Sequence, residues 1–274
     1  MKLGIMVPLD EDLENGFSNA QKLGFETCQL VCWAEDMYTD AVAARVVLAA
    51  GRTGVEITAL WCGWPGPAIW NFTEGPLTSG LVPLEYRYVR MEALKRGSDF
   101  ARKIHVSQMI THVGFIPEDP NSEVYRGLLS ALQVIVARCR ENGQRFLFES
   151  GQETPVTLLR TIQDLGQQNV GINLDPANLL MYGKANPVDA LEVFGSYVYD
   201  VHAKDGEYPT DGRNLGVEKP MGKGAVDFPA LIAKLQKLGY DGPVTIEREI
   251  SGVEQTRDIL FAKAMLEKLI NQSK

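Results

Sequence analysis

Four ionisable residues stand where short apolar runs of the chain come to an end. Glu149 closes the run in "FLFES", Asp175 lies in "GINLDPAN", His202 in "VYDVHAKDG" and Glu247 in "VTIERE". Taken singly, each has an ordinary structural explanation, such as a turn, a helix cap, a surface ion pair or a semi-buried histidine. Taken together, two glutamates, an aspartate and a histidine in equivalent positions point to a common site.

Three carboxylates and one imidazole form a suitable ligand set for a divalent cation. Carboxylates that converge in one pocket repel one another and raise each other's pKa unless a cation lies between them. A set of mostly oxygen ligands with one imidazole favours Mn²⁺, with Mg²⁺, Co²⁺ and Zn²⁺ as alternatives. We therefore predict a site for one divalent metal ion.

Eight short apolar runs along the chain are predicted to be strands. They cover residues 3–7, 27–32, 55–60, 106–113, 145–149, 170–175, 197–203 and 243–247. Amphipathic stretches separate them, and several of these, such as "FPALIAKLQKLG", end in a helix stop signal. Near-continuous apolar strands separated by helices are typical of a parallel sheet that is covered on both faces.

Eight such units in 274 residues favour an α/β fold, the (β/α)8 TIM barrel, as a single domain over residues 1–274. A doubly wound open sheet is the alternative, but the turn after the first strand, "VPLDEDLENG", has no glycine-rich phosphate motif. In a barrel the carboxyl ends of all strands open onto one face, where catalytic groups lie. The four ionisable residues are therefore expected to meet on that face.

Aromatic residues are concentrated in the loops of the same face. The irregular stretch "WCGWPGPAIWNF" at 61–72 holds three of the four tryptophans, including Trp61, and Trp33 follows the second strand. Aromatic rings in such loops can bind a sugar ring or simply pack on one another, and both interpretations stay open at this point. Trp33 and Trp61 are our candidates for substrate contacts.

A second long loop, at 204–224, follows the strand that carries the histidine. Long loops in compact domains are more often functional than idle, and Arg213 in this loop is a candidate for binding an anionic or polyhydroxyl group. Asp205, three residues after His202, is a candidate for orienting a metal ligand or the substrate. We expect Lys204 to be solvated.

Composition excludes several classes of partner. The net charge of −8 opposes binding to nucleic acid, which needs a basic surface. No uncharged apolar stretch approaches the roughly 18 residues of a membrane helix, and the first residues lack a secretory signal. Four cysteines without CxxC spacing indicate reduced thiols and a cytoplasmic protein. The amphipathic segment 253–270 could serve as a contact in a homo-oligomer.

The order Glu, Asp, His, Glu on the last four strands resembles the xylose isomerase-like TIM barrel superfamily. Within it, the chain is most similar to the sugar phosphate isomerase/epimerase family, which includes ketose 3-epimerases. The resemblance covers essentially the whole chain and is strongest in "THVGF", "FLFESGQET", "GINLDPANL", "VHAKDG" and "PMGKGAVDFPALIAKLQKLGYDGPVTIERE". These motifs identify the superfamily well and the substrate poorly.

The resemblance implies a role for each residue of the site. Glu149, Asp175, His202 and Glu247 would hold a single divalent metal, and the two glutamates would also move protons on opposite faces of a sugar. The reaction implied is proton abstraction next to a carbonyl through an enediolate stabilised by the metal. Near the substrate the resemblance places three further residues, His112, Glu153 and Arg213.

One position departs from the family pattern. Many relatives have a histidine three residues after the aspartate of the sixth strand, whereas this chain has "DPAN" with Asn178. An asparagine still forms hydrogen bonds to a sugar hydroxyl, but it cannot take a proton from it. This change puts the best-known epimerase substrates in doubt.

The expected partner is a small carbohydrate, and four functions remain open. The first is a metal-dependent sugar isomerase or epimerase. The second is a lyase or deglycosidase acting on 3-keto-glycosides, which the tryptophans mildly favour. An endonuclease IV-like phosphodiesterase fits poorly, because that activity needs more histidines than the three of this chain. A barrel that binds sugar without catalysis is the fourth.

Overall fold

Eight parallel strands close into a barrel in the computed structural model, which describes residues 1–272. The strands are β1 (Lys2–Pro8), β2 (Thr27–Cys32), β3 (Glu56–Cys62), β4 (Gln108–Thr111), β5 (Arg145–Glu149), β6 (Val170–Leu174), β7 (Val198–Ala203) and β10 (Pro243–Ile246). Closure comes from the pairing of β1 with β10, which runs from Lys2 beside Pro243 to Ile5 beside Ile246. The predicted barrel is confirmed, and the open-sheet alternative is wrong because no strand edge is left between the first and last strands.

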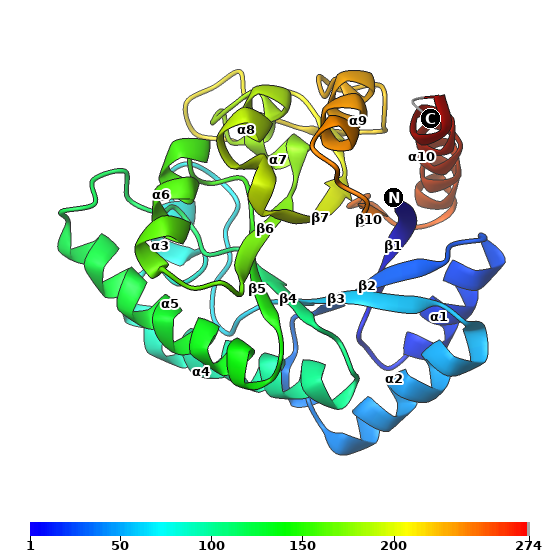
Figure 1. The fold of residues 1–274 in the computed structure, drawn as a ribbon, viewed down its shortest axis with the longest axis horizontal. Coiled ribbons are helices and arrows are strands. Elements are labelled where there is room, and N and C mark those ends of the chain that lie inside the picture. Colours follow the sequence, from blue (N-terminus) through cyan, green and yellow to red (C-terminus); the bar gives the residue numbers. More distant parts are fainter. Residues whose placement is uncertain (273–274) are drawn as a thin grey trace.

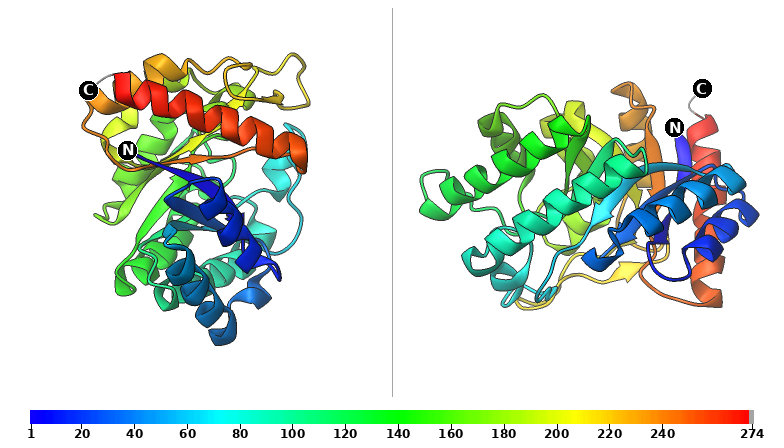
Figure 2. Two further views of the ribbon diagram at one scale, coloured as in Figure 1. Left: turned by 90° about the vertical axis from the view of Figure 1, so that its right-hand side faces the viewer. Right: turned by 90° about the horizontal axis from the view of Figure 1, so that it is seen from below.

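Helices surround the barrel on the outside (Figure 1). The long ones are α1 (Leu13–Lys22), α2 (Asp40–Thr53), α4 (Leu84–Lys103), α5 (Glu123–Glu141), α6 (Pro155–Leu165), α8 (Pro187–Phe194), α9 (Phe228–Lys237) and α10 (Val253–Gln272). Shorter helical turns are η1 (Glu35–Met37), α3 (Gly75–Thr78), α7 (Pro176–Met181) and η2 (Gly195–Tyr197). Their apolar faces pack on the outer faces of the strands to form the main core. The last helix, α10, lies beside β1, so the two ends of the described chain share one side of the molecule (Figure 2).

The inside of the barrel is apolar on one side and polar on the other. Ala59, Trp61, Ile110 and Leu147 pack together inside β3, β4 and β5. On the opposite side lie the fully buried Thr27, Gln29, Asn173, Asp200 and Thr245. The register of the strands explains why these polar residues lie together, because residues paired across neighbouring parallel strands point to the same face of the sheet. Asn173 pairs with Glu149 and with Asp200. Thr245 pairs with His202. The polar side therefore continues directly into the candidate site.

Two loops meet over the carboxyl ends of the strands. Asn71, between β3 and α3, forms a bridge with Asn214, and the Phe72 amide donates a hydrogen bond of 2.8 Å to the Arg213 carbonyl. The loop after β7 is less irregular than predicted, because β8 (Asp205–Gly206) and β9 (Glu218–Lys219) form a small antiparallel sheet within it. The second panel of Figure 2 shows the two loops on the same edge of the molecule.

Asp205 organises the end of this second loop. Its buried carboxylate accepts hydrogen bonds from the backbone N–H groups of Gly222, Gly224 and Val226 at 2.8, 3.0 and 3.1 Å, and from that of Gly206. These four donors leave the carboxylate occupied by the backbone of its own loop. Asp205 therefore fixes the path of the chain from β7 to α9.

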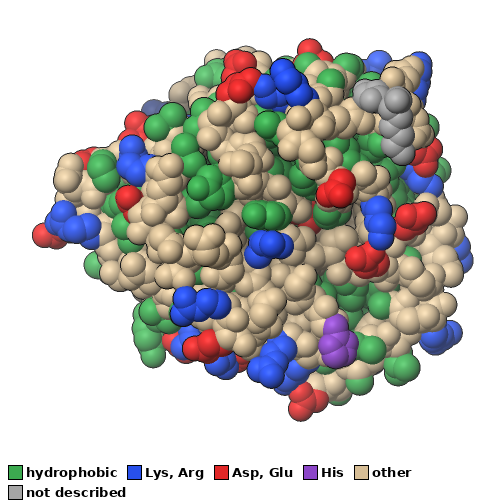
Figure 3. All heavy atoms as spheres, in the orientation of Figure 1, with side chains coloured by type: hydrophobic (Ala, Val, Ile, Leu, Met, Phe, Trp, Pro, Cys, Tyr) green, Lys and Arg blue, Asp and Glu red, His purple; other side chains and the backbone are tan. Residues whose placement is uncertain are grey.

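The surface charge, the length and hydropathy of the helices and the exposed residues of α10 concern the predicted binding partners. On the face drawn in Figure 3, positive and negative side chains are interspersed. No helix within residues 1–272 is both long and apolar enough to cross a membrane. Along α10, Leu260 and Phe261 stay exposed, and the predicted contact of this helix in an oligomer stays a prediction.

We expect Asp205→Ala to lower the free energy of unfolding by about 2 kcal/mol or more, because it leaves buried backbone donors without an acceptor. Urea unfolding followed by circular dichroism measures this loss. The exposed Asp241 provides a matched control, since Asp241→Ala removes the same group from the surface. Equal stability of the two variants would contradict the role assigned to Asp205.

Candidate metal centre and active site

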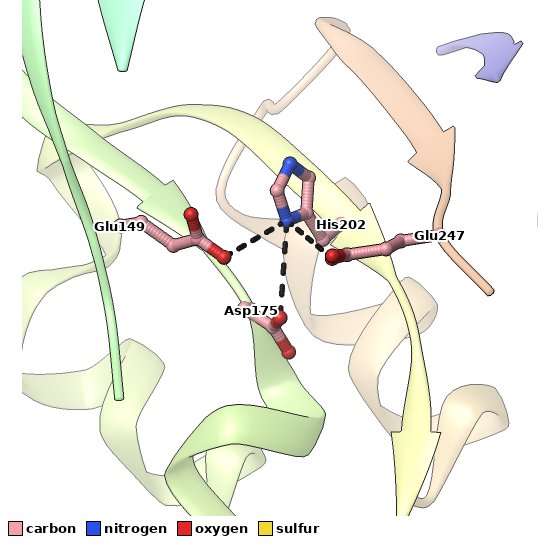
Figure 4. A group of neighbouring side chains, drawn as sticks. All are labelled: Glu149, Asp175, His202 and Glu247. Atoms are coloured by element: carbon pink, nitrogen blue, oxygen red, sulfur yellow. Dashed lines mark ion pairs between the residues drawn. The ribbon is translucent and has the colours of Figure 1, made fainter. Parts of the chain in front are cut away.

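The four predicted residues meet at the carboxyl end of the barrel. One ligand atom from each of Glu149, Asp175, His202 and Glu247 lies within 4.8 Å of the other three. The His202 Nδ1 is central, at 3.3 Å from Glu149 Oε1, 3.8 Å from Asp175 Oδ2 and 2.8 Å from Glu247 Oε2. Figure 4 shows the two glutamates on opposite sides of the imidazole, with Asp175 between them.

Unsatisfied polar atoms show that this cluster suits a cation. Among residues 1–272, Asp175 Oδ2, His202 Nδ1 and Glu247 Oε2 are buried without a hydrogen-bond partner. Such atoms are costly to leave unpaired. Ligand atoms about 2.1 Å from one Mg²⁺-sized cation lie about 3 Å apart in neighbouring octahedral positions, which is close to the spacing of this cluster. The residues therefore fit a divalent metal ion.

Asp175 serves the fold and the site at once. It precedes Pro176 at the start of α7, and its Oδ1 accepts a hydrogen bond of 2.9 Å from the Asn178 amide as a helix cap. The other oxygen, Oδ2, faces His202. The capping function suggested by the sequence is thus performed by one oxygen of the carboxylate, and the other oxygen is left to hold a metal ion.

Gln29 determines how the imidazole is presented. Its Oε1 lies 2.8 Å from His202 Nε2, below the site on β2. Because this oxygen can only accept, Nε2 carries a proton and Nδ1 is the atom turned toward the carboxylates. Burial opposes a charged imidazole, but the charges of Glu247 and Glu149 outweigh it and hold the pKa of His202 well above its ordinary value. The cluster thus attracts positive charge strongly.

Glu149 is the most constrained of the ligands. Trp61 donates its indole N–H to Oε2, Asn178 donates to Oε1 at 3.2 Å, and His112 Nε2 lies 3.4 Å from Oε1. Burial favours the neutral acid, yet the nearby His112 and His202 hold the pKa of Glu149 well below its usual range. Glu149 is accordingly an ionised carboxylate with a fixed direction.

Lys204 corrects the sequence analysis, which placed it in solvent. Only 3% of the residue is exposed, and Nζ lies 2.5 Å from Glu249, 3.5 Å from Glu247, 3.6 Å from Asp175 and 3.4 Å from the Asn178 side-chain oxygen. Burial disfavours the ammonium, but the charges of Glu247, Asp175 and Glu249 raise the pKa of Lys204 well above its ordinary value. Its position two residues after His202 was the available signal, since alternate strand residues point to one face.

A cavity of about 530 Å³ opens above the cluster. It brings together four residues predicted to contact substrate: Trp33, Trp61, His112 and Asn178. Further lining residues, which were not predicted to contact substrate, include Trp70, Tyr182, Lys204, Asn214, Leu215 and Glu249. Most of these residues lie in loops. The sequence of a loop shows no periodic pattern from which its contact with the site could be predicted.

Three predicted site residues lie away from this cavity wall. Glu153 is buried behind it, and burial raises the pKa of its carboxyl group to about 8. Arg213 is exposed and does not line the cavity, although the three residues that follow it do. Asp205 is bound to backbone donors of its own loop, as described above.

Comparison with known proteins identifies the family. Residues 17–269 match the family described as "Xylose isomerase-like TIM barrel". The chain belongs to this family. The resemblance inferred from the sequence motifs is thereby confirmed.

Solved structures with the same fold cover the whole barrel. A xylose isomerase domain protein from Planctomyces limnophilus has a TM-score of 0.94 and 33% identity, over 99% of this chain and 98% of that one. A D-tagatose 3-epimerase-like protein gives 0.78 and 22%, over 100% and 98%. The 3-keto-D-glucoside 4-epimerase from E. coli gives 0.74 and 18%, over 98% and 99%. At the lower identities the likeness concerns the fold.

Removing His202 or its hydrogen-bond partner should weaken metal binding. We expect His202→Ala to abolish stoichiometric binding of Mn²⁺, and Gln29→Leu to weaken it about 10- to 100-fold by releasing the imidazole. Isothermal titration calorimetry on the metal-free protein measures both. The exposed His105 is the matched control, and His105→Asn suits its positive φ of 60°. Unchanged affinity in His202→Ala would exclude it as a ligand.

Proposed function

We propose that this protein is a metal-dependent sugar isomerase or epimerase, which abstracts a proton from a carbon next to a carbonyl group. The observation that supports this most strongly is the placement of Glu149 and Glu247 on opposite sides of one cation-binding cluster at the floor of a cavity. A divalent cation held by the four residues would act as a Lewis acid toward the carbonyl oxygen of the substrate.

The two glutamates perform the proton transfers in this proposal. Glu149 is held ionised by His112 and His202, which is the form that accepts a proton, although the same lowered pKa makes it a weaker base. Glu247 keeps Oε2 free of hydrogen bonds, while its Oε1 lies 3.5 Å from the Lys204 ammonium. A substrate between the two carboxylates can lose a proton on one face and regain it on the other, which inverts the carbon centre. Transfer on one face alone gives an aldose–ketose isomerisation.

Neighbouring residues orient the substrate. Asn178 donates to Glu149 and accepts from Lys204 at 3.4 Å, so it links the base to an ammonium group that lines the cavity. His112 lies on the cavity wall beside Glu149 and can form a hydrogen bond with a sugar hydroxyl. These groups suit the predicted partner, a small carbohydrate.

The charge of the cavity favours a substrate without phosphate. Within residues 1–272, Lys204 is the one lysine or arginine that lines the cavity, and its ammonium already faces three carboxylates. Phosphate recognition normally relies on arginine or lysine side chains that are free to bind it. We therefore propose an uncharged keto-sugar or a derivative of one.

Glu247→Gln should retain the fold and lower proton exchange at the substrate carbon by at least about 10²-fold, because the amide cannot accept a proton. Incubation with a panel of keto-sugars in D₂O, followed by NMR of the exchanging C–H group, measures this rate. Glu254→Gln, an exposed glutamate on α10, should exchange at the wild-type rate. Undiminished exchange in Glu247→Gln would refute its acid/base role.

Removal of metal should stop the reaction reversibly. We expect EDTA followed by gel filtration to abolish exchange, and Mn²⁺ or Co²⁺ to restore it, because the four ligands lose the Lewis acid that they hold. Circular dichroism before and after treatment checks that the barrel stays folded. Activity that is indifferent to complete removal of metal would exclude the proposed mechanism.

A further inference from the structure

All four tryptophans of the chain form one cluster, and three of them, Trp33, Trp61 and Trp70, line the cavity. The ring centroid of Trp33 lies 5.0 Å from that of Trp61, 5.3 Å from that of Trp64 and 6.4 Å from that of Trp70. Trp61 reaches inward and donates its indole N–H to the Glu149 carboxylate. The aromatic cluster is therefore continuous with the catalytic centre.

Exposure divides the cluster into two buried and two open rings. Trp61 and Trp64 are 5% and 3% exposed, whereas Trp33 and Trp70 are 46% and 39% exposed. Both open rings line the cavity. Large aromatic surface left open beside a polar site is expensive in water unless a ligand covers it.

The open rings are held in place by the loop beneath them. The buried Arg90 donates hydrogen bonds to the carbonyls of Pro65, Pro67, Thr78 and Gly80, which fixes the loop that carries Trp64 and Trp70. Its guanidinium also lies 5.5 Å from the centroid of the Trp64 ring. A surface ordered before binding loses little conformational entropy when a ligand arrives.

Trp33 depends on a glycine in the same loop. A Cβ added at Gly63 would lie 2.4 Å from Cε3 of the Trp33 ring, so only glycine leaves room for the indole to pack against the backbone here. Trp33 is thereby kept beside Trp61, the ring that donates a hydrogen bond to the carboxylate of Glu149.

We propose that Trp33 and Trp70 form a binding subsite for a second, uncharged ring of the substrate. The preferred substrate is then a neutral glycoside, whose first ring lies between Glu149 and Glu247 and whose second ring, a sugar or an aryl group, stacks on the open indoles. This inference rests on the proposed function, because the position of the first ring is taken from it. The same cavity charge that disfavours phosphate also disfavours an anionic second ring.

Binding of unreactive glycosides tests the subsite separately from catalysis. Methyl and phenyl glycosides of glucose, galactose and mannose, together with methyl cellobioside and methyl lactoside, carry neither a ketone nor a free aldehyde, so their binding does not require turnover. Since three of the four tryptophans line the cavity, quenching of intrinsic fluorescence reports binding directly. We expect a phenyl glycoside or a disaccharide to bind about tenfold more tightly than the matching methyl glycoside.

Variants assign this preference to the two open rings. Trp33→Ala and Trp70→Ala should reduce the preference to about twofold or less, and Trp33→Phe should keep part of it because a ring remains. Tyr88→Ala, which removes an aromatic side chain that is 69% exposed on α4, should leave it unchanged. The comparison of phenyl with disaccharide ligands shows which kind of second ring is preferred.

The outcomes separate the two proposals. Equal affinity for methyl, phenyl and disaccharide ligands of every hexose, or the absence of any saturable quenching, overturns the subsite. A preference that survives in both alanine variants overturns it as well. If the preference is found but no keto-sugar or keto-glycoside exchanges a proton, the subsite stands and the proposed reaction fails.

Discussion

Concentrated negative charge in a buried pocket is the constraint on which this structure depends. Glu149, Asp175 and Glu247 converge within a few ångströms, where little water can screen them. The chain supplies partial compensation through His202 and Lys204. The remaining unpartnered ligand atoms are what make a divalent cation a natural occupant. Without some such positive charge, one or more of these carboxylates would have to take up a proton or move apart.

The barrel meets this constraint by separating its interior into two halves. The apolar half under β3, β4 and β5 gives packing energy, and Trp61 at its top fixes the direction of Glu149. The polar half supplies Gln29, which turns the imidazole so that Nδ1 faces the carboxylates. The same strands thus stabilise the fold and set the direction of the ligands, because alternate residues of each strand face the interior.

Loops complete the site in a different manner. Arg90 and Asp205 each satisfy several backbone groups, one in the loop after β3 and the other in the loop after β7. Both are buried ionic side chains whose partners are neutral backbone atoms, and each fixes irregular chain that has no helix or sheet to order it. The tryptophans and the Asn214 segment can then form a wall of defined shape around the clustered carboxylates.

The sequence by itself determined the eight strands, the family and the four residues that cluster at the end of the barrel, because apolar runs and the residues that end them are local features. It also pointed to the tryptophans and Asn178 as cavity residues. Only the tertiary structure decided the places of Lys204, Gln29 and Arg213. A lysine after a strand is solvated unless other parts of the chain place carboxylates beside it. Here the carboxylates of Asp175, Glu247 and Glu249 surround the Lys204 ammonium. Gln29 is 173 residues from His202, so no local sequence pattern predicts their contact. The path of the loop that carries Arg213 is fixed by Asp205, so local sequence does not predict the place of Arg213 either.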